Sequence, residues 1–217
     1  MNSNSKYFKY KNKYLQLKNN LLGGVGGTKT LYITIGVPGS GKTTRCERAA
    51  QILKGVRYEA DDFSGLYDGG FKPELLPAAH AWCKENVKKA MTDNIEDIYQ
   101  SNTNLNPRDM LNYLQFAVTY SYKVKIIIPE QDKLLHYPTE LLYPDQKAHV
   151  IEVRSGVVDG QKSIPIGAMN SMITLFETNI GRIRKIKSEL DENDLERNPQ
   201  SWIDQINILF PRPLPKR

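Results

Sequence analysis

From Leu31 onward, the chain alternates between strand-like and helix-like patterns of hydrophobic residues. Apolar or alternating runs predict four strands, at residues 31–35, 56–60, 95–101 and 123–128. Amphipathic segments between them predict helices, at residues 42–53, 74–91 and 106–120. Because strands and helices alternate, we expect an α/β fold in which helices cover both faces of a parallel sheet.

The flanking segments suggest where the domain begins and ends. Residues 1–28 form a lysine-rich leader that ends in a glycine linker, so we place the domain at residues 29–187. Within it, residues 130–149 contain Pro138 and Pro144 and predict a loop or insertion. A last helix is expected from about Pro165. Residues 188–217 predict a polar linker, a possible edge strand at 202–210 and a basic tail.

Composition adds a basic charge, but its position limits what it implies. The formal net charge is +6, and residues 1–30 account for all of it, with six lysines and no acidic residue. In the rest of the chain the numbers of basic and acidic residues are equal. The net charge therefore gives no evidence that the folded domain binds nucleic acid. The leader itself predicts a short amphipathic helix that docks on the domain or contacts a protein partner, nucleic acid or a membrane surface.

Two further compositional features bear on the compartment. No run approaches the 18 to 20 apolar residues of a membrane span, and the N-terminus lacks the apolar core of a secretory signal. Cys46 and Cys83 are the two cysteines, too few for a disulfide framework. We therefore expect a cytoplasmic protein without a membrane span, in which both thiols are reduced.

The segment GVPGSGKTT, from Gly36 to Thr44, carries the most specific chemistry. It follows a predicted strand, opens a predicted helix, and matches the phosphate-binding pattern GxxxxGK[ST]. In such loops backbone amides surround phosphates, the lysine neutralises β and γ oxygens, and the Ser or Thr hydroxyl binds Mg²⁺. ATP and Mg²⁺ are therefore the expected cofactors. The predicted nucleotide-binding residues are Gly36, Pro38, Gly39, Ser40, Gly41, Lys42, Thr43 and Thr44.

Asp61 and Asp62 follow the second predicted strand. In an open parallel sheet, the carboxyl ends of neighbouring strands meet at one crevice, so these carboxylates should lie near the phosphate loop. Phosphoryl transfer needs such a group to orient the attacking oxygen or accept its proton. An Asp pair after a strand is equally typical of a turn or helix cap, and the local sequence leaves both interpretations open.

The chain resembles two groups of proteins in four segments and in the order in which they occur. The segments are ITIGVPGSGKTT, EADDF, SNTNLNP and YKVKIIIPE. The two groups are the phage-type polynucleotide 5′-hydroxyl kinases and the related NEDD4-binding-protein-2-like kinase domains. The resemblance covers roughly residues 31–180. It implies a three-layer P-loop NTPase fold of the kinase type, with a parallel sheet and a helical lid near 154–167. The leader also resembles those of giant DNA virus proteins, which implies a viral origin in host cytoplasm or virion.

The same resemblance implies roles for individual residues. Asp61 would be the base that accepts the hydroxyl proton, and Asp62 would support the metal beside Thr43. Thr103 and Asn104 would shape the acceptor side. Arg154 would close over the phosphates from the lid, with Lys162 as a second candidate for that role.

Some positions depart from the family pattern. Ser64 stands where the phage-type enzymes have an arginine that holds the acceptor, and Ser101 and Asn102 stand where an aspartate usually precedes TN. The sequence thus predicts an ATP-dependent phosphotransferase acting on an alcohol, with a DNA or RNA 5′-hydroxyl end as the expected acceptor. A kinase for a nucleoside, sugar or antibiotic, and a nucleotide-binding interaction module without transfer activity, remain as alternatives.

Overall fold

The computed structural model describes residues 28–68, 70–128, 164 and 166–212 of the 217-residue chain. Within them lies a parallel sheet of four strands in the order β2-β3-β1-β4. The strands are β1 (Thr30–Thr34), β2 (Val56–Tyr58), β3 (Asp97–Gln100) and β4 (Lys123–Ile127). All four were predicted, including the polar β3, which is buried along its whole length.

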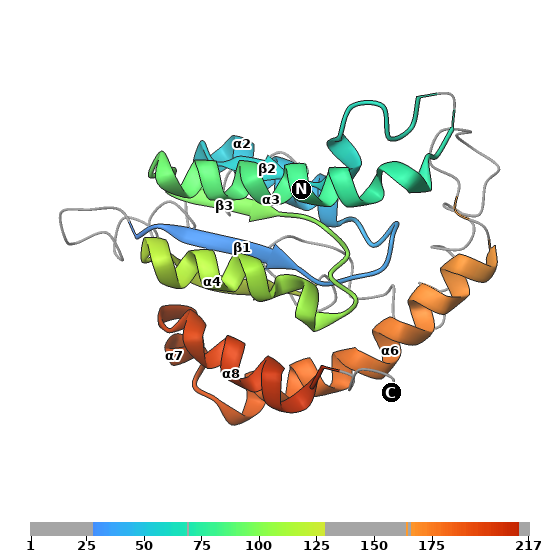
Figure 1. The fold of residues 1–217 in the computed structure, drawn as a ribbon. Coiled ribbons are helices and arrows are strands. Elements are labelled where there is room, and N and C mark those ends of the chain that lie inside the picture. Colours follow the sequence, from blue (N-terminus) through green and yellow to red (C-terminus); the bar gives the residue numbers. More distant parts are fainter. Residues whose placement is uncertain (1–27, 69, 129–163, 165, 213–217) are drawn as a thin grey trace, which may run out of the picture.

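Helices connect these strands and continue beyond β4 (Figure 1). The described α-helices are α2 (Lys42–Leu53), α3 (Leu76–Thr92), α4 (Leu111–Tyr120), α6 (Ile166–Glu189), α7 (Glu192–Arg197) and α8 (Pro199–Leu209). Three short 3₁₀ turns accompany them within the described residues, η1 (Ala60–Asp62), η2 (Pro73–Leu75) and η3 (Pro107–Met110). The α/β prediction is therefore confirmed, and the first helix has the predicted bounds.

Side-chain alternation in the strands divides the core between the two faces of the sheet. Tyr32 and Tyr99 stack with ring centroids 4.5 Å apart, and Tyr99 packs with Cys46 and Ala50 of α2. On the other face Leu31 and the neighbouring strands' apolar residues pack against α3 and α4. Because successive strand residues point to opposite faces, one short strand supports both layers.

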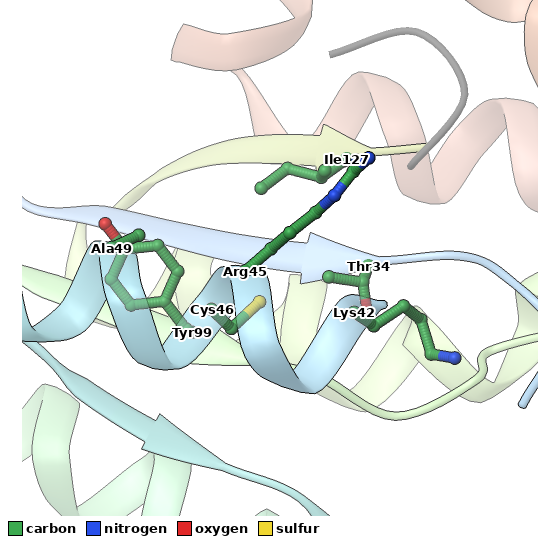
Figure 2. A pocket seen from close by; sticks show the side chains of 7 residues that line it. All are labelled: Thr34, Lys42, Arg45, Cys46, Ala49, Tyr99 and Ile127. Carbon is green, nitrogen blue, oxygen red and sulfur yellow. The ribbon is translucent and has the colours of Figure 1, made fainter. Parts of the chain in front are cut away.

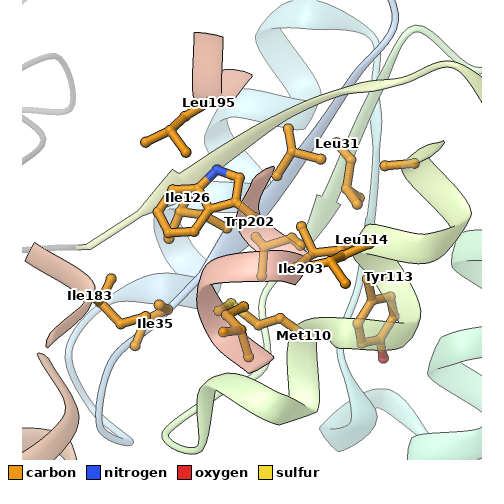
Figure 3. Close-up of a cluster of buried hydrophobic side chains, with 14 of the residues drawn as sticks. Leu31, Ile35, Met110, Tyr113, Leu114, Ile126, Ile183, Leu195, Trp202 and Ile203 are labelled. Atoms are coloured by element: carbon orange, nitrogen blue, oxygen red, sulfur yellow. The ribbon is translucent and has the colours of Figure 1, made fainter. Parts of the chain in front are cut away.

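The C-terminal segment corrects the sequence prediction. Residues 202–210 were expected to form an edge strand, but α8 occupies most of this range. The buried residues of α8 are Pro199, Trp202, Ile203 and Ile206, and these steps of three and four residues follow one face of a helix, whereas a strand would bury alternate residues. Asn198 caps the helix by accepting a hydrogen bond from the Gln200 amide. The expected linker likewise contains α7, and its buried Leu195 joins the main core with Trp202 (Figure 3).

Several predicted segments fall outside the described residues. These are the leader through residue 27, the insertion at 130–149, the tail at 213–217, and most of the lid at 154–167, including Arg154 and Lys162. Among the helices that the structure describes, none has the length and hydrophobicity needed to cross a bilayer.

Candidate nucleotide-binding and phosphotransfer site

The turn between β1 and α2 has the backbone shape of a phosphate loop. Gly39 and Gly41 have φ angles of 83° and 80°, in the left-handed region where a side chain is strained. The Gly36 amide donates a hydrogen bond to the Thr103 carbonyl, N to O 3.0 Å, which ties the loop to the segment after β3. Glycines at these positions therefore allow the chain to turn sharply into α2.

Polar groups of this loop fit a phosphate ligand. The first amides of an α-helix lack intrahelical partners and carry the positive end of the helix dipole. Buried Lys42 begins α2, and its ammonium folds back to donate to the Val37 carbonyl at 2.8 Å. The Ser40 hydroxyl is buried and has no hydrogen-bond partner among the described residues. A bound phosphate would supply acceptors for these donors.

A small cavity lies beneath α2, but it is not the nucleotide site. Its volume is about 10 Å³, at the lower limit for one water molecule. Figure 2 shows Lys42 and Arg45 leaving the first turn of α2 in different directions, with Arg45 extending toward Ile127 of β4. The nucleotide would have to lie over the outer side of the loop, where the α2 amides begin.

Glu59 connects the phosphate loop to the end of β2. Its Oε2 accepts hydrogen bonds from the Thr43 hydroxyl at 2.7 Å, from Arg57 Nη1 at 2.9 Å and from the Ser101 hydroxyl at 3.2 Å. The Glu59 side chain is only 12% exposed. Burial raises the pKa of its carboxyl, and the hydrogen bond from Thr43 partly opposes this effect. Because Thr43 is the predicted metal ligand, Glu59 belongs to the site.

Arg57 lies at the centre of the charged cluster beside this carboxylate. Its Nη2 is 2.9 Å from Asp62 Oδ2 and 3.3 Å from Glu47 Oε1, in addition to the pair with Glu59. Burial opposes the guanidinium charge, but the hydrogen bond and charge of Asp62 and the two glutamates outweigh it and raise the pKa of Arg57. The cluster therefore fixes the end of β2 against α2.

The two predicted aspartates occupy η1, directly after β2. Asp61 is half-buried two residues after Glu59, and its charge contributes to raising the pKa of the Glu59 carboxyl. The Asp62 carboxylate pairs with Arg57 on a more exposed side, where 36% of its side chain is accessible. Among the described residues, Glu59 rather than Asp62 contacts Thr43. The structure thus brings Asp61 to the edge of the sheet that carries the phosphate loop.

The segment after β3 supports the site from within the fold. The Asn102 side-chain oxygen accepts a hydrogen bond from the Ala60 amide at 2.8 Å and thereby anchors η1. Asn104 is buried, and its side-chain amide donates to the Thr34 carbonyl at 2.8 Å and to Gln100 Oε1 at 2.6 Å. Thr103 is half-buried and holds Gly36 through its carbonyl. Asn104 was predicted to shape the acceptor side. In the structure its side-chain amide makes hydrogen bonds within the fold.

Replacing Asn104 should be costly for folding. Asn104→Ala is expected to lower the free energy of unfolding by roughly 2–4 kcal/mol, because it leaves buried partners unsatisfied and puts alanine in left-handed backbone. Asn104 has a φ of 45°. The unfolding midpoint in urea measures the effect. Exposed Asn112→Ala is the control, expected within roughly 0.5 kcal/mol of the parent, and an equally small effect at Asn104 would contradict the prediction.

The sequence interpretation did not single out Arg57 and Glu59. Their spacing was the signal that could have identified them. Residues two apart on a strand share a face, as Arg57 and Glu59 would, and residues four apart on a helix share a face, as Thr43 and Glu47 do on α2. Ser101 and Asn102, noted as departures from the family pattern, are both buried and bonded to this region. Ser64 lies exposed after η1.

Burial also determines the state of the two cysteines. It raises the pKa of Cys46 to about 12 and that of Cys83 to about 11. Both thiols therefore stay protonated at neutral pH, and both are free in the structure. Cys83 contributes to the small core around η1, with Leu66 and Ala79.

Comparison with known proteins supports this description. Residues 31–136, just under half of the chain, match the family model of an AAA domain. A chain in the Pnkp1/Rnl/Hen1 RNA repair complex is 19% identical, with a TM-score of 0.51 over 74% of this chain and 48% of that chain. A second structure, of the Pnkp1/Rnl/Hen1 complex, is 20% identical with a TM-score of 0.40 and covers 63% and 42%, respectively. This chain thus spans about half the length of those it matches.

The match and the shared fold define the class of protein. Residues 31–136 match the AAA domain model, and the part of the chain that the structure describes has an α/β P-loop fold of the kinase type. The resemblance to P-loop kinases of the polynucleotide kinase type, predicted from the sequence, is therefore confirmed at the level of the fold. A P-loop domain of this class binds a nucleotide through its phosphates.

Proposed function

We propose that this protein is an ATP-dependent kinase that transfers the γ-phosphoryl group to the 5′-hydroxyl end of DNA or RNA. The observation that carries the proposal is the 2.7 Å hydrogen bond from Thr43 to Glu59. It brings the end of β2, with Asp61 two residues further on, against the phosphate loop. A carboxylate next to the outer end of a bound triphosphate is what transfer to an alcohol requires.

In the proposed reaction, the acceptor oxygen forms a bond to the γ-phosphorus while the bond from that phosphorus to the β,γ-bridging oxygen breaks. ADP leaves, and Asp61 takes the hydroxyl proton. Lys42 holds the β and γ oxygens, and Arg154, from the lid outside the described residues, balances their charge. Mg²⁺ held by the Thr43 hydroxyl would neutralise part of the charge on the same oxygens.

The residues present fit a magnesium ion bound together with a nucleotide. The described residues contain no cluster of three or more His, Cys, Asp or Glu side chains able to hold a metal alone. Mg²⁺ commonly binds through one or two protein groups plus substrate phosphates and waters. Thr43, with a carboxylate beside it, matches that mode of binding.

The acceptor is tested by incubating the full chain with γ-labelled ATP and a panel of candidate alcohols. The panel contains 5′-hydroxyl DNA and RNA oligonucleotides, nucleosides and sugars, and matched 5′-phosphorylated oligonucleotides serve as controls. Label on the 5′-hydroxyl oligonucleotides alone is the expected result. Label confined to nucleosides or sugars would replace the polynucleotide acceptor by a small molecule. Nucleotide binding without any transfer would indicate an interaction module instead.

A further inference from the structure

The hydrogen bonds of Glu59 are unevenly distributed over its carboxylate. Those from Thr43, Arg57 and Ser101 all go to Oε2. Among the described residues, Oε1 therefore remains available as an acceptor. The carboxylate is largely buried, with Oε2 fixed by three donors and Oε1 without a donor in the part of the chain that the structure describes.

The contact with Thr43 determines which way that hydroxyl faces. A hydroxyl has one hydrogen and two lone pairs, so donating the hydrogen to Glu59 leaves the lone pairs of Thr43 Oγ1 for a cation. Without a carboxylate acceptor, the same hydroxyl could turn its hydrogen toward the loop or a phosphate. A carboxylate at this position would thus act on a cation at Thr43 through the orientation of the hydroxyl.

Arg57 keeps the Glu59 carboxylate in this place. Its guanidinium bonds Glu59 at 2.9 Å and the Ser101 hydroxyl at 3.2 Å, and only 13% of its side chain is exposed. Two further carboxylates, Asp62 and Glu47, hold the guanidinium from its other side. A planar guanidinium with several fixed partners restricts the rotation of the side chains it binds.

We propose that Glu59 is a positioning residue for the magnesium ion of bound MgATP, oriented by Arg57 and acting through the Thr43 hydroxyl. The proposal rests on the proposed function, because it assumes that the phosphate loop binds a magnesium nucleotide. It assigns to Glu59 the supporting role that the resemblance gave to Asp62. The Oε1 atom of Glu59 would accept a hydrogen bond from a water of the hydrated ion.

The proposal is tested by the magnesium dependence of nucleotide binding, with no acceptor present. A fluorescent ATP analogue is titrated with the full chain over a range of Mg²⁺ concentrations and in EDTA. Glu59→Gln is expected to raise the Mg²⁺ concentration needed for half-maximal enhancement of binding by about 10-fold, as losses of supporting groups around metals do. Binding in EDTA should stay within roughly twofold of the parent, because the loop amides and Lys42 are retained.

Glu85→Gln is the matched control, since it makes the same chemical change at an exposed position of α3 that takes no part in the contacts of Glu59, Arg57 and Thr43 described above. Its magnesium dependence should equal that of the parent. Thermal unfolding of each variant reports whether the fold is retained. An unchanged Mg²⁺ requirement in folded Glu59→Gln would overturn the proposal.

A double-mutant cycle with Thr43→Ala separates positioning from a general electrostatic effect. If Glu59 acts through the Thr43 hydroxyl, Glu59→Gln should add little to the Mg²⁺ requirement once that hydroxyl is absent, so the two effects are non-additive. Additive effects would show that Glu59 acts independently of Thr43 and would also overturn the proposal. A chain that binds MgATP in this way but phosphorylates no polynucleotide would refute the proposed acceptor and leave this inference intact.

Discussion

Asp61→Asn is expected to lower the rate of phosphoryl transfer to a 5′-hydroxyl end by about 10²–10⁴-fold, the usual contribution of a general base. The amide cannot take the hydroxyl proton, although it has nearly the shape of the carboxylate. Nucleotide affinity should be unchanged, because the bonds of η1 to the fold run through the Ala60 amide and Asp62. Single-turnover transfer from labelled ATP measures the rate, and equilibrium binding of an ATP analogue measures the affinity.

Two neighbouring substitutions make this result specific. Asp68→Asn changes an exposed aspartate in the segment after η1 and should leave transfer at the parental rate. Asp62→Asn weakens the pair with Arg57, so its main effect should be on the position of η1 rather than on proton transfer. Transfer by Asp61→Asn at the rate of Asp68→Asn would remove Asp61 from the role of base.

Lys42→Ala is expected to abolish stable nucleotide binding and to lower transfer by at least about 10²-fold, comparable to losing a main electrostatic contact of a transition state. Lys42 is almost fully buried at the start of α2, 5% exposed, where a charge is held only if a partner compensates it. Its hydrogen bond to the Val37 carbonyl keeps the ammonium over the loop. Binding of the ATP analogue and labelling of the oligonucleotide are both measured.

Arg48→Ala provides the charge-matched control on the same helix. Arg48 is exposed on α2, so its removal changes the net charge equally without reaching the loop. Its nucleotide affinity should remain within roughly twofold of the parent, as for other exposed surface changes. Full labelling by Lys42→Ala would mean that the nucleotide is bound somewhere other than at Gly36–Thr44.

Local sequence patterns predicted most of the described helices and strands, because hydrophobic residues recur in each of them with a clear helical or strand period. The helix 42–53 begins after glycine and has the predicted bounds, three strands fall within the predicted runs, and β1 begins one residue before its predicted start. The segment 202–210 was interpreted wrongly, because a short apolar run with Trp202, Ile203 and Ile206 has no decisive period when read alone. The helix becomes evident from its cap at Asn198 and from its packing against α4.

The sequence by itself determined the phosphate loop, since glycines, a lysine and a threonine at fixed spacing between strand and helix leave little freedom for another backbone shape. It also placed Asp61 and Asp62 at the carboxyl end of a strand. Only the tertiary structure decided which carboxylate reaches Thr43. The choice of Glu59 depends on the packing of β2 against α2 and on Arg57, contacts between segments that are distant in sequence and that no local period encodes.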